Sequence, residues 1–122
     1  MLLRTSILLL LILTACGKDL PALEGIDTDK WKSDKNACLG DRRAMEESMR
    51  LEMGKLKGLA EMDILKLLGR PDANELYKRN QKFYYYFLSP APTCTSRDSI
   101  TQRLVLRFNA MGYAQAVSIE RI

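Results

Sequence analysis

The sequence contains no histidine, the side chain that proteins use most often as a general base and metal ligand near neutral pH. It has only three cysteines, and no two of them are spaced as the Cys-x-x-Cys pair of redox and zinc sites. A glycine-rich phosphate-binding motif is also missing. These absences argue against an enzyme, and we expect no metal, no other cofactor and no small-molecule substrate.

A block of like charge is missing too, although the net charge at pH 7 is +4. In the segment before the domain, lysines and aspartates alternate: Asp27, Asp29, Lys30, Lys32, Asp34 and Lys35. We find no RNA-binding, zinc-finger or helix-turn-helix motif. The sequence therefore predicts no nucleic-acid partner.

No hydrophobic run reaches the length of about 20 residues that a membrane-spanning helix needs. The run over residues 5–13 follows Arg4 and leads into Leu13-Thr14-Ala15-Cys16. A basic residue, a short apolar stretch and small residues before a cleavage point are typical of an export signal. A cysteine directly after them resembles a bacterial lipobox, in which Cys16 carries diacylglycerol and, after cleavage, an N-acyl chain. An ordinary signal peptide with an unrelated cysteine is the alternative.

Lipidation of Cys16 would anchor the chain firmly in membrane lipid, because each buried CH₂ contributes about 0.8 kcal/mol and two or three acyl chains act together. Gly17 follows the cysteine, where inner-membrane retention in enteric bacteria is associated with aspartate. We therefore expect a lipid-anchored protein of the bacterial cell envelope, on the periplasmic side of the outer membrane.

The chain is expected to divide into a signal peptide, a tether and one small domain. Residues 1–15 form the signal peptide, and residues 16–36 form a lipidated N-terminus and flexible tether, since Pro21, Gly25 and mixed charges leave no apolar period. Residues 37–122 form the domain. Trp31 is the exception within the tether, and we expect it to pack on the domain instead of lying at the lipid interface.

Cys38 and Cys94 remain as a pair if Cys16 is lipidated. In an oxidising compartment a disulfide between them is the default expectation. It would contribute roughly 3–4 kcal/mol of stability in the chain-entropy model. Because sequence spacing does not show that the two Cα atoms come within bonding reach, two free thiols are the alternative.

Two helices are expected at the start of the domain. Over residues 37–53, Met45 and Met49 recur at helical spacing and are interpreted as core, while Arg42 and other charged residues form the solvent face. The second helix spans residues 60–68. It should end at Gly69, because glycine favours the position after a helix and Pro71 prevents continuation.

Three strands are expected to follow, over residues 77–88, 100–109 and 113–120. The expected fold class is α+β, with two N-terminal helices packed on one face of a three-stranded antiparallel sheet. The residues that should point inward from the middle strand are Leu104, Leu106 and Phe108.

Two surfaces are candidates for binding a partner. The first is the outer face of the sheet, to which we assign Tyr84, Tyr86, Arg103, Val105 and Arg107. Tyrosines beside arginines are typical of interface hot spots, and a solvent face stabilised by cross-strand packing is the alternative. The second is the loop that contains Pro90 and Pro92, for which a rigid turn without a partner is the alternative.

Residues 56–72, LKGLAEMDILKLLGRPD, resemble the helical signature of the SmpA/OmlA family of small outer-membrane lipoproteins, roughly G-M-T-x-x-D-V-x-x-L-L-G-x-P-D. The aromatic strand, the strand that follows it and the last strand after a glycine turn suit the same layout. The resemblance implies two helices against a three-stranded sheet, a fold shared with β-lactamase-inhibitor-like domains. Leu59-Ala60 stands where the family has Met-Thr, so a hydroxyl cap is missing.

The family includes the small accessory subunit of the β-barrel assembly machinery. The resemblance therefore implies a binding or scaffolding role with an envelope protein as partner, in outer-membrane protein assembly or envelope integrity. Two alternatives remain open. One is a periplasmic protein inhibitor of a hydrolase that uses the loop over residues 89–99. The other is a structural lipoprotein that connects membrane and cell wall.

Overall fold

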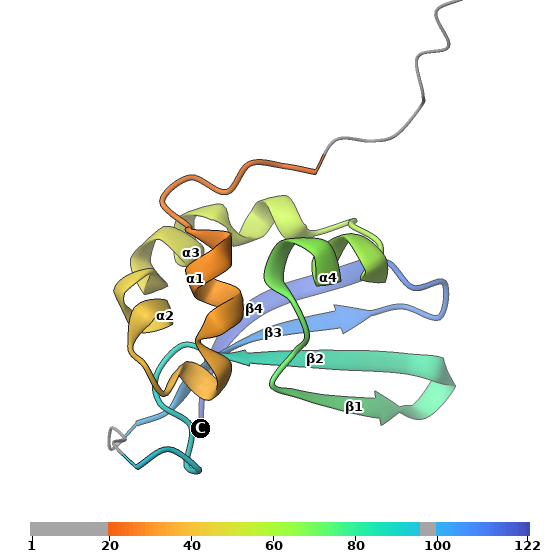
Figure 1. Ribbon diagram of the computed structural model, residues 1–122. Coiled ribbons are helices and arrows are strands. Elements are labelled where there is room, and N and C mark those ends of the chain that lie inside the picture. The colour runs from red at the N-terminus through yellow and green to blue at the C-terminus, as the bar shows by residue number, and fades with distance from the viewer. Residues whose placement is uncertain (1–19, 96–99) are drawn as a thin grey trace, which may run out of the picture.

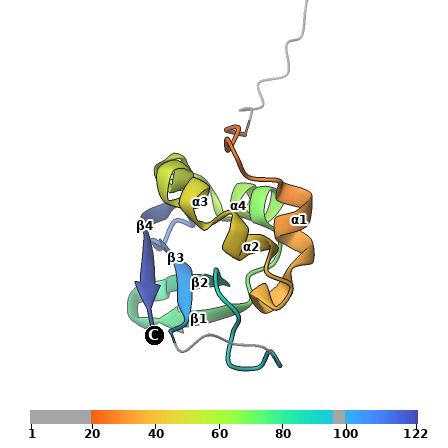
Figure 2. The ribbon, with the colours of Figure 1, turned by 90° about the vertical axis from the view of Figure 1, so that its left-hand side faces the viewer.

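The computed structural model describes residues 20–95 and 100–122, where four α-helices precede one antiparallel sheet (Figures 1 and 2). The helices are α1 (Thr28–Ser33), α2 (Asp41–Ala44), α3 (Glu46–Glu52) and α4 (Glu61–Leu68), with 3₁₀ turns η2 (Lys35–Ala37) and η3 (Met53–Leu56). The strands are β1 (Ala73–Tyr77), β2 (Gln81–Phe87), β3 (Gln102–Phe108) and β4 (Ala114–Arg121), and the 3₁₀ turn η4 (Lys78–Asn80) joins the first two. The helices lie together on one side of the sheet.

The expected three-stranded sheet is wrong, because the described chain forms four strands in the order β1-β2-β3-β4. The additional strand, β1, pairs antiparallel with β2 from Ala73 opposite Tyr85 to Tyr77 opposite Gln81. All five of its residues are exposed. Since it buries no side chain, the alternation of apolar and polar residues that marks a half-buried strand is missing from it.

The single helix expected over residues 37–53 is also wrong. Asn36 and Ala37 both have positive φ, 59° and 57°, so the chain turns sharply before α2. A second break at Met45 (φ −99°, ψ 6°) separates α2 from α3. Met45 and Met49 nevertheless lie in the core, as the spacing of the methionines predicts.

Helix α4 follows the sequence prediction closely. Ile64, Leu67 and Leu68 are buried, and the helix ends at Leu68, before Gly69 with φ 76°. A Cβ at this glycine would also lie 2.9 Å from Cγ of Lys32. The positive φ of Gly69 favours glycine at this position, and a larger residue would also displace the side chain of Lys32.

The core lies between the helices and the inner face of the sheet. Leu104, Leu106 and Phe108 point into it, as predicted. β2 pairs with β3 so that Tyr84 is opposite Leu106 and Tyr86 is opposite Leu104. Directly opposite residues of an antiparallel pair lie on the same face. The outward orientation expected for the two tyrosines is therefore wrong, and they are only 7% and 0% exposed.

Part of the expected tether belongs to the domain. Leu23 and Trp31 are core residues, 8% and 0% exposed, and the Asp27 carboxylate caps α1 by accepting hydrogen bonds from two backbone N–H groups. The expected docking of Trp31 is confirmed, and the flexible segment does not extend to residue 36. The signal peptide and Cys16 lie outside the described residues.

Candidate functional site

The outer face of the sheet is the candidate site, because no helix of the described chain covers it (Figures 1 and 2). The pairing of the strands assigns to this face Glu75 and Tyr77 from β1, Phe83, Tyr85 and Phe87 from β2, Arg103, Val105 and Arg107 from β3, and Ala116, Ser118 and Glu120 from β4. Aromatic and guanidinium groups therefore occupy its centre.

The aromatic side chains form a continuous row across β1 and β2. The ring of Tyr77 meets the ring of Phe83 edge-on, with 6.0 Å between centroids. Phe83 stacks on Tyr85 with 6.2 Å between ring centroids and 10° between ring planes. The guanidinium of Arg103 then covers the Tyr85 ring at 3.8 Å from its centroid. Such cation–π contacts contribute about 0.5–2 kcal/mol, depending on how far they are removed from water.

Long side chains on this face shield one another from water. Arg103 donates from Nε to Oε1 of Glu120 at 2.5 Å, which fixes the guanidinium above Tyr85. As a result Tyr85 is only 6% exposed although no helix covers it, and this burial raises the pKa of its hydroxyl. The face is therefore preorganised and needs little side-chain ordering when a partner binds.

The structure separates the residues that the sequence assigned to one surface. Arg103 and Arg107 lie on the outer face, while Tyr84 and Tyr86 face the helices. In the loop after β2, Pro90 is buried and Pro92 is exposed.

The sequence prediction missed Phe83, Tyr85 and Phe87, the aromatic residues of β2 that face outward. No local signal separated the two sets, because both alternating faces of β2 carry aromatic side chains.

The two inward tyrosines connect the sheet to α4. The hydroxyl of Tyr84 donates to Oε1 of Glu61, which also accepts from Nζ of Lys82 at 3.1 Å. The hydrogen bond from Tyr84 lowers the pKa of Glu61, and burial raises the pKa of Tyr84. Tyr86 donates to the carbonyl of Gly69 at 2.8 Å. Tyr84 and Tyr86 therefore stabilise the contact between the sheet and α4 and are not available to bind a partner.

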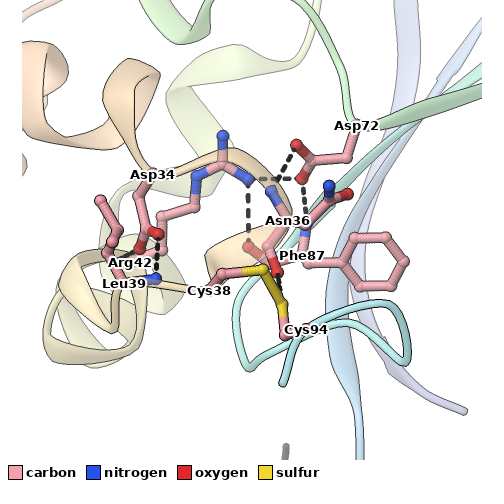
Figure 3. Close-up of a disulfide and its surroundings, with 8 residues drawn as sticks. All are labelled: Asp34, Asn36, Cys38, Leu39, Arg42, Asp72, Phe87 and Cys94. Atoms are coloured by element: carbon pink, nitrogen blue, oxygen red, sulfur yellow. Dashed lines mark hydrogen bonds and ion pairs between the residues drawn. A yellow bond between two sulfur atoms is a disulfide. The ribbon is translucent and has the colours of Figure 1, made fainter. Parts of the chain in front are cut away.

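Cys38 and Cys94 form the expected disulfide, with a Cα–Cα distance of 5.4 Å (Figure 3). The bond joins the turn after η2 to the loop after β2. Ala91 in this loop also donates its N–H to the carbonyl of Asn36 at 2.9 Å. The described part of the loop is therefore held against the domain at two points.

A buried ion pair lies beside the disulfide (Figure 3). Nη1 of Arg42 is 2.5 Å from Oδ2 of Asp72, and Nε of Arg42 donates to the carbonyl of Trp31 at 2.9 Å. The solvent position expected for Arg42 is wrong, since the residue is 1% exposed. Arg42 is three residues before Met45 and seven before Met49, so helical spacing itself places it on the buried face, and only its charge suggested solvent.

Both carboxylates around Arg42 are fully used by the fold. Asp72 accepts from the backbone N–H groups of Asn36 at 2.9 Å and Phe87 at 2.8 Å. Asp34 accepts from the N–H groups of Leu39 at 2.7 Å and Arg42 at 2.9 Å. This network connects η2 and α2 to the end of β2, and it is satisfied internally.

Residues 20–95 and 100–122 contain no group of three or more acidic, cysteine or histidine side chains placed to hold a metal ion. Within the same residues, no helix combines the length and the apolar character needed to cross a membrane. Comparison with models of known families, with curated proteins and with solved structures finds no match. The resemblance of residues 56–72 to the SmpA/OmlA signature therefore remains a hypothesis.

Proposed function

We propose that the chain is a lipid-anchored protein of the bacterial cell envelope that binds a partner protein through the outer face of its sheet. The observation that carries the proposal is the row of Tyr77, Phe83 and Tyr85 ending under Arg103 on a face without a covering helix. Aromatic residues and arginine are enriched in protein interfaces and in their hot spots.

Two features support the compartment. The segment Leu13-Thr14-Ala15-Cys16 has the order of a lipobox. The Cys38–Cys94 bond is of the kind that persists in the oxidising environment of the bacterial periplasm. The outer membrane remains the proposed location because Gly17 follows the cysteine.

Within this class we propose an accessory role in outer-membrane protein assembly or envelope integrity, as the SmpA/OmlA resemblance implies. The support is the helix of that motif, which ends at Leu68 before Gly69 and Pro71. The four-stranded sheet differs from the three strands that the resemblance implies.

Site-specific photocrosslinking in cells tests the binding face. A photoreactive residue at Ser118, exposed on the outer face, is compared with one at Ala44, exposed on α2. We expect the full-length lipoprotein to crosslink to one envelope protein from position 118 and not from position 44. The substitution Arg107→Glu should abolish this crosslink. Arg121→Glu, which makes the same charge change at the end of β4, should leave it intact.

The identity of the captured molecule distinguishes the rival functions. A muramidase or β-lactamase captured from residues 89–95, and inhibited by the protein, would replace our proposal with a hydrolase inhibitor. Recovery of peptidoglycan alone would favour a lipoprotein that connects membrane and wall. Mass spectrometry of the N-terminal peptide tests the anchor, for which we expect diacylglycerol and an N-acyl chain on Cys16.

A further inference from the structure

The anchor and the folded domain are separated by very little chain. Leu20 already packs against the core, and only residues 17–19 lie between it and Cys16. Extended chain covers at most about 3.6 Å per residue, so the Cα atoms of Cys16 and Leu20 are within roughly 14 Å of each other on any path. Lipid attached to Cys16 would therefore hold a particular part of the domain next to the bilayer.

That part is fixed because the segment after Leu20 is bound to α3 and η3. Leu23 is buried, and Nζ of Lys55 donates to the carbonyl of Ala22 at 3.1 Å. Gly25 runs so close to α3 that a Cβ there would overlap the side chain of Ser48. These contacts lie within three residues on either side of Leu23, so they hold the segment tightly.

The position of this segment relative to the sheet follows from the two ribbon views. Residues 20–27, coloured orange, run over the helical layer on the side away from the strands (Figures 1 and 2). An anchor that reaches only roughly 14 Å beyond Leu20 places α3 and η3 nearest the lipid. The outer face of the sheet then lies on the far side of the domain.

The exposed residues next to the anchor segment include one leucine and two lysines, together with the acidic Glu47 one helical turn before Leu51. Leu51 is 77% exposed and lies one helical turn after Ser48 in α3, whose side chain lies against the segment that leads to the anchor. Lys55 in η3 and Lys57 directly after it are also exposed. Leu51 can enter the boundary between headgroups and acyl chains, and Lys57 can extend its amine to lipid phosphates. The amine of Lys55 is paired with Glu52 and bound to the Ala22 carbonyl, so it holds the segment that leads to the anchor.

We propose that the surface formed by α3, η3 and the residue after η3, which carries Leu51, Lys55 and Lys57, lies against the bilayer in which Cys16 is anchored. The inference rests on the proposed lipidation of Cys16 and adds the orientation of the domain. It predicts that the row of Tyr85 and Arg103 is directed away from the lipid, where a periplasmic protein reaches it.

An environment-sensitive fluorophore tests this orientation. The full-length lipoprotein is labelled at Leu51→Cys or, as a matched control, at Ser118→Cys, and reconstituted in vesicles of phosphatidylethanolamine and phosphatidylglycerol. Both positions are exposed, and the introduced thiol is the reactive one, because Cys38 and Cys94 are bonded and Cys16 would be acylated. We expect a blue shift and quenching by brominated lipid at position 51 and neither at position 118.

The outcomes separate this inference from the function on which it rests. An acylated, vesicle-bound protein whose two probes respond equally, or whose probe at position 118 responds more, would overturn the orientation and leave the anchor in place. A protein that carries no acyl mass on Cys16 and does not float with the vesicles would overturn both.

Discussion

Arg42 and Asp72 form an ion pair whose side chains are only 1% and 2% exposed, with 2.5 Å between Nη1 and Oδ2. The pair joins α2 to the segment between α4 and β1, two regions far apart in the sequence. Arg42 also covers the ring of Trp31 at 4.9 Å from its centroid. One guanidinium thus connects the N-terminal segment, the helices and the sheet.

Removing the charge of Asp72 should strongly destabilise the domain. In Asp72→Asn the charge of Arg42 stays buried without its counterion, so we expect the free energy of unfolding to fall by about 3–5 kcal/mol. Urea unfolding followed by circular dichroism measures the change. Glu46→Gln is the matched control, because its 3.0 Å pair with Arg50 is exposed, and it should cost less than about 1 kcal/mol. Equal effects of the two substitutions would contradict the buried pair.

Loss of the disulfide should lower stability without changing the fold. The cysteines are 56 residues apart, and a loop of this length is expected to contribute roughly 3–4 kcal/mol. The double variant Cys38→Ala/Cys94→Ala should therefore unfold at lower urea concentration than the oxidised protein. The parent protein in reductant should match the variant. If reductant has no effect on the parent protein, the bond does not contribute.

Trp31 is the only tryptophan, so its fluorescence reports directly on the docking of the N-terminal segment. We expect short-wavelength emission that soluble quenchers do not reach, and a red shift on unfolding. Trp31→Ala should cost about 3–5 kcal/mol, as for other large core residues. Emission typical of solvent-exposed tryptophan in the folded protein would contradict this position and restore a longer tether.

The raised pKa values of Tyr84, Tyr85 and Tyr86 predict that the domain loses stability at alkaline pH. Burial raises the pKa of all three hydroxyls above their ordinary value of 10.0. Above pH 10 the unfolded chain loses these protons while the folded chain keeps them, so the free energy of unfolding falls as pH rises. The slope approaches about 1.4 kcal/mol per pH unit for each of Tyr84 and Tyr86, whose pKa values are raised the most.

The variant Tyr86→Phe tests this alkaline loss. It removes one titrating hydroxyl and the hydrogen bond to Gly69. We expect it to cost about 0.5–1.5 kcal/mol at pH 7 and to reduce the slope above pH 10. An unchanged alkaline slope, measured by urea unfolding at several pH values, would contradict the role of Tyr86.

The elements predicted correctly are those that neighbouring residues control. The end of α4 depends on Gly69 and Pro71, which act on the backbone within a few residues. The inward positions of Leu104, Leu106 and Phe108 follow from strand alternation with one apolar face. The Cys38–Cys94 bond is the exception, because it joins residues 56 apart and was expected only from the count of cysteines that remain if Cys16 is lipidated.

Pairing and packing between distant segments account for the rest. In β2 both faces are aromatic, so alternation alone does not tell which set is buried, and only the register with β3 assigns Tyr84 and Tyr86 to the core. β1 buries no side chain and is held by backbone hydrogen bonds to β2, so its sequence does not need an alternating apolar pattern. The charge of Arg42 predicts a surface position, and only the folded chain brings Asp72 close enough to pair with it in the interior. Local signals in the sequence specify turns, helix ends and strand periods, whereas the choice of the buried face depends on partners that only the folded chain brings together.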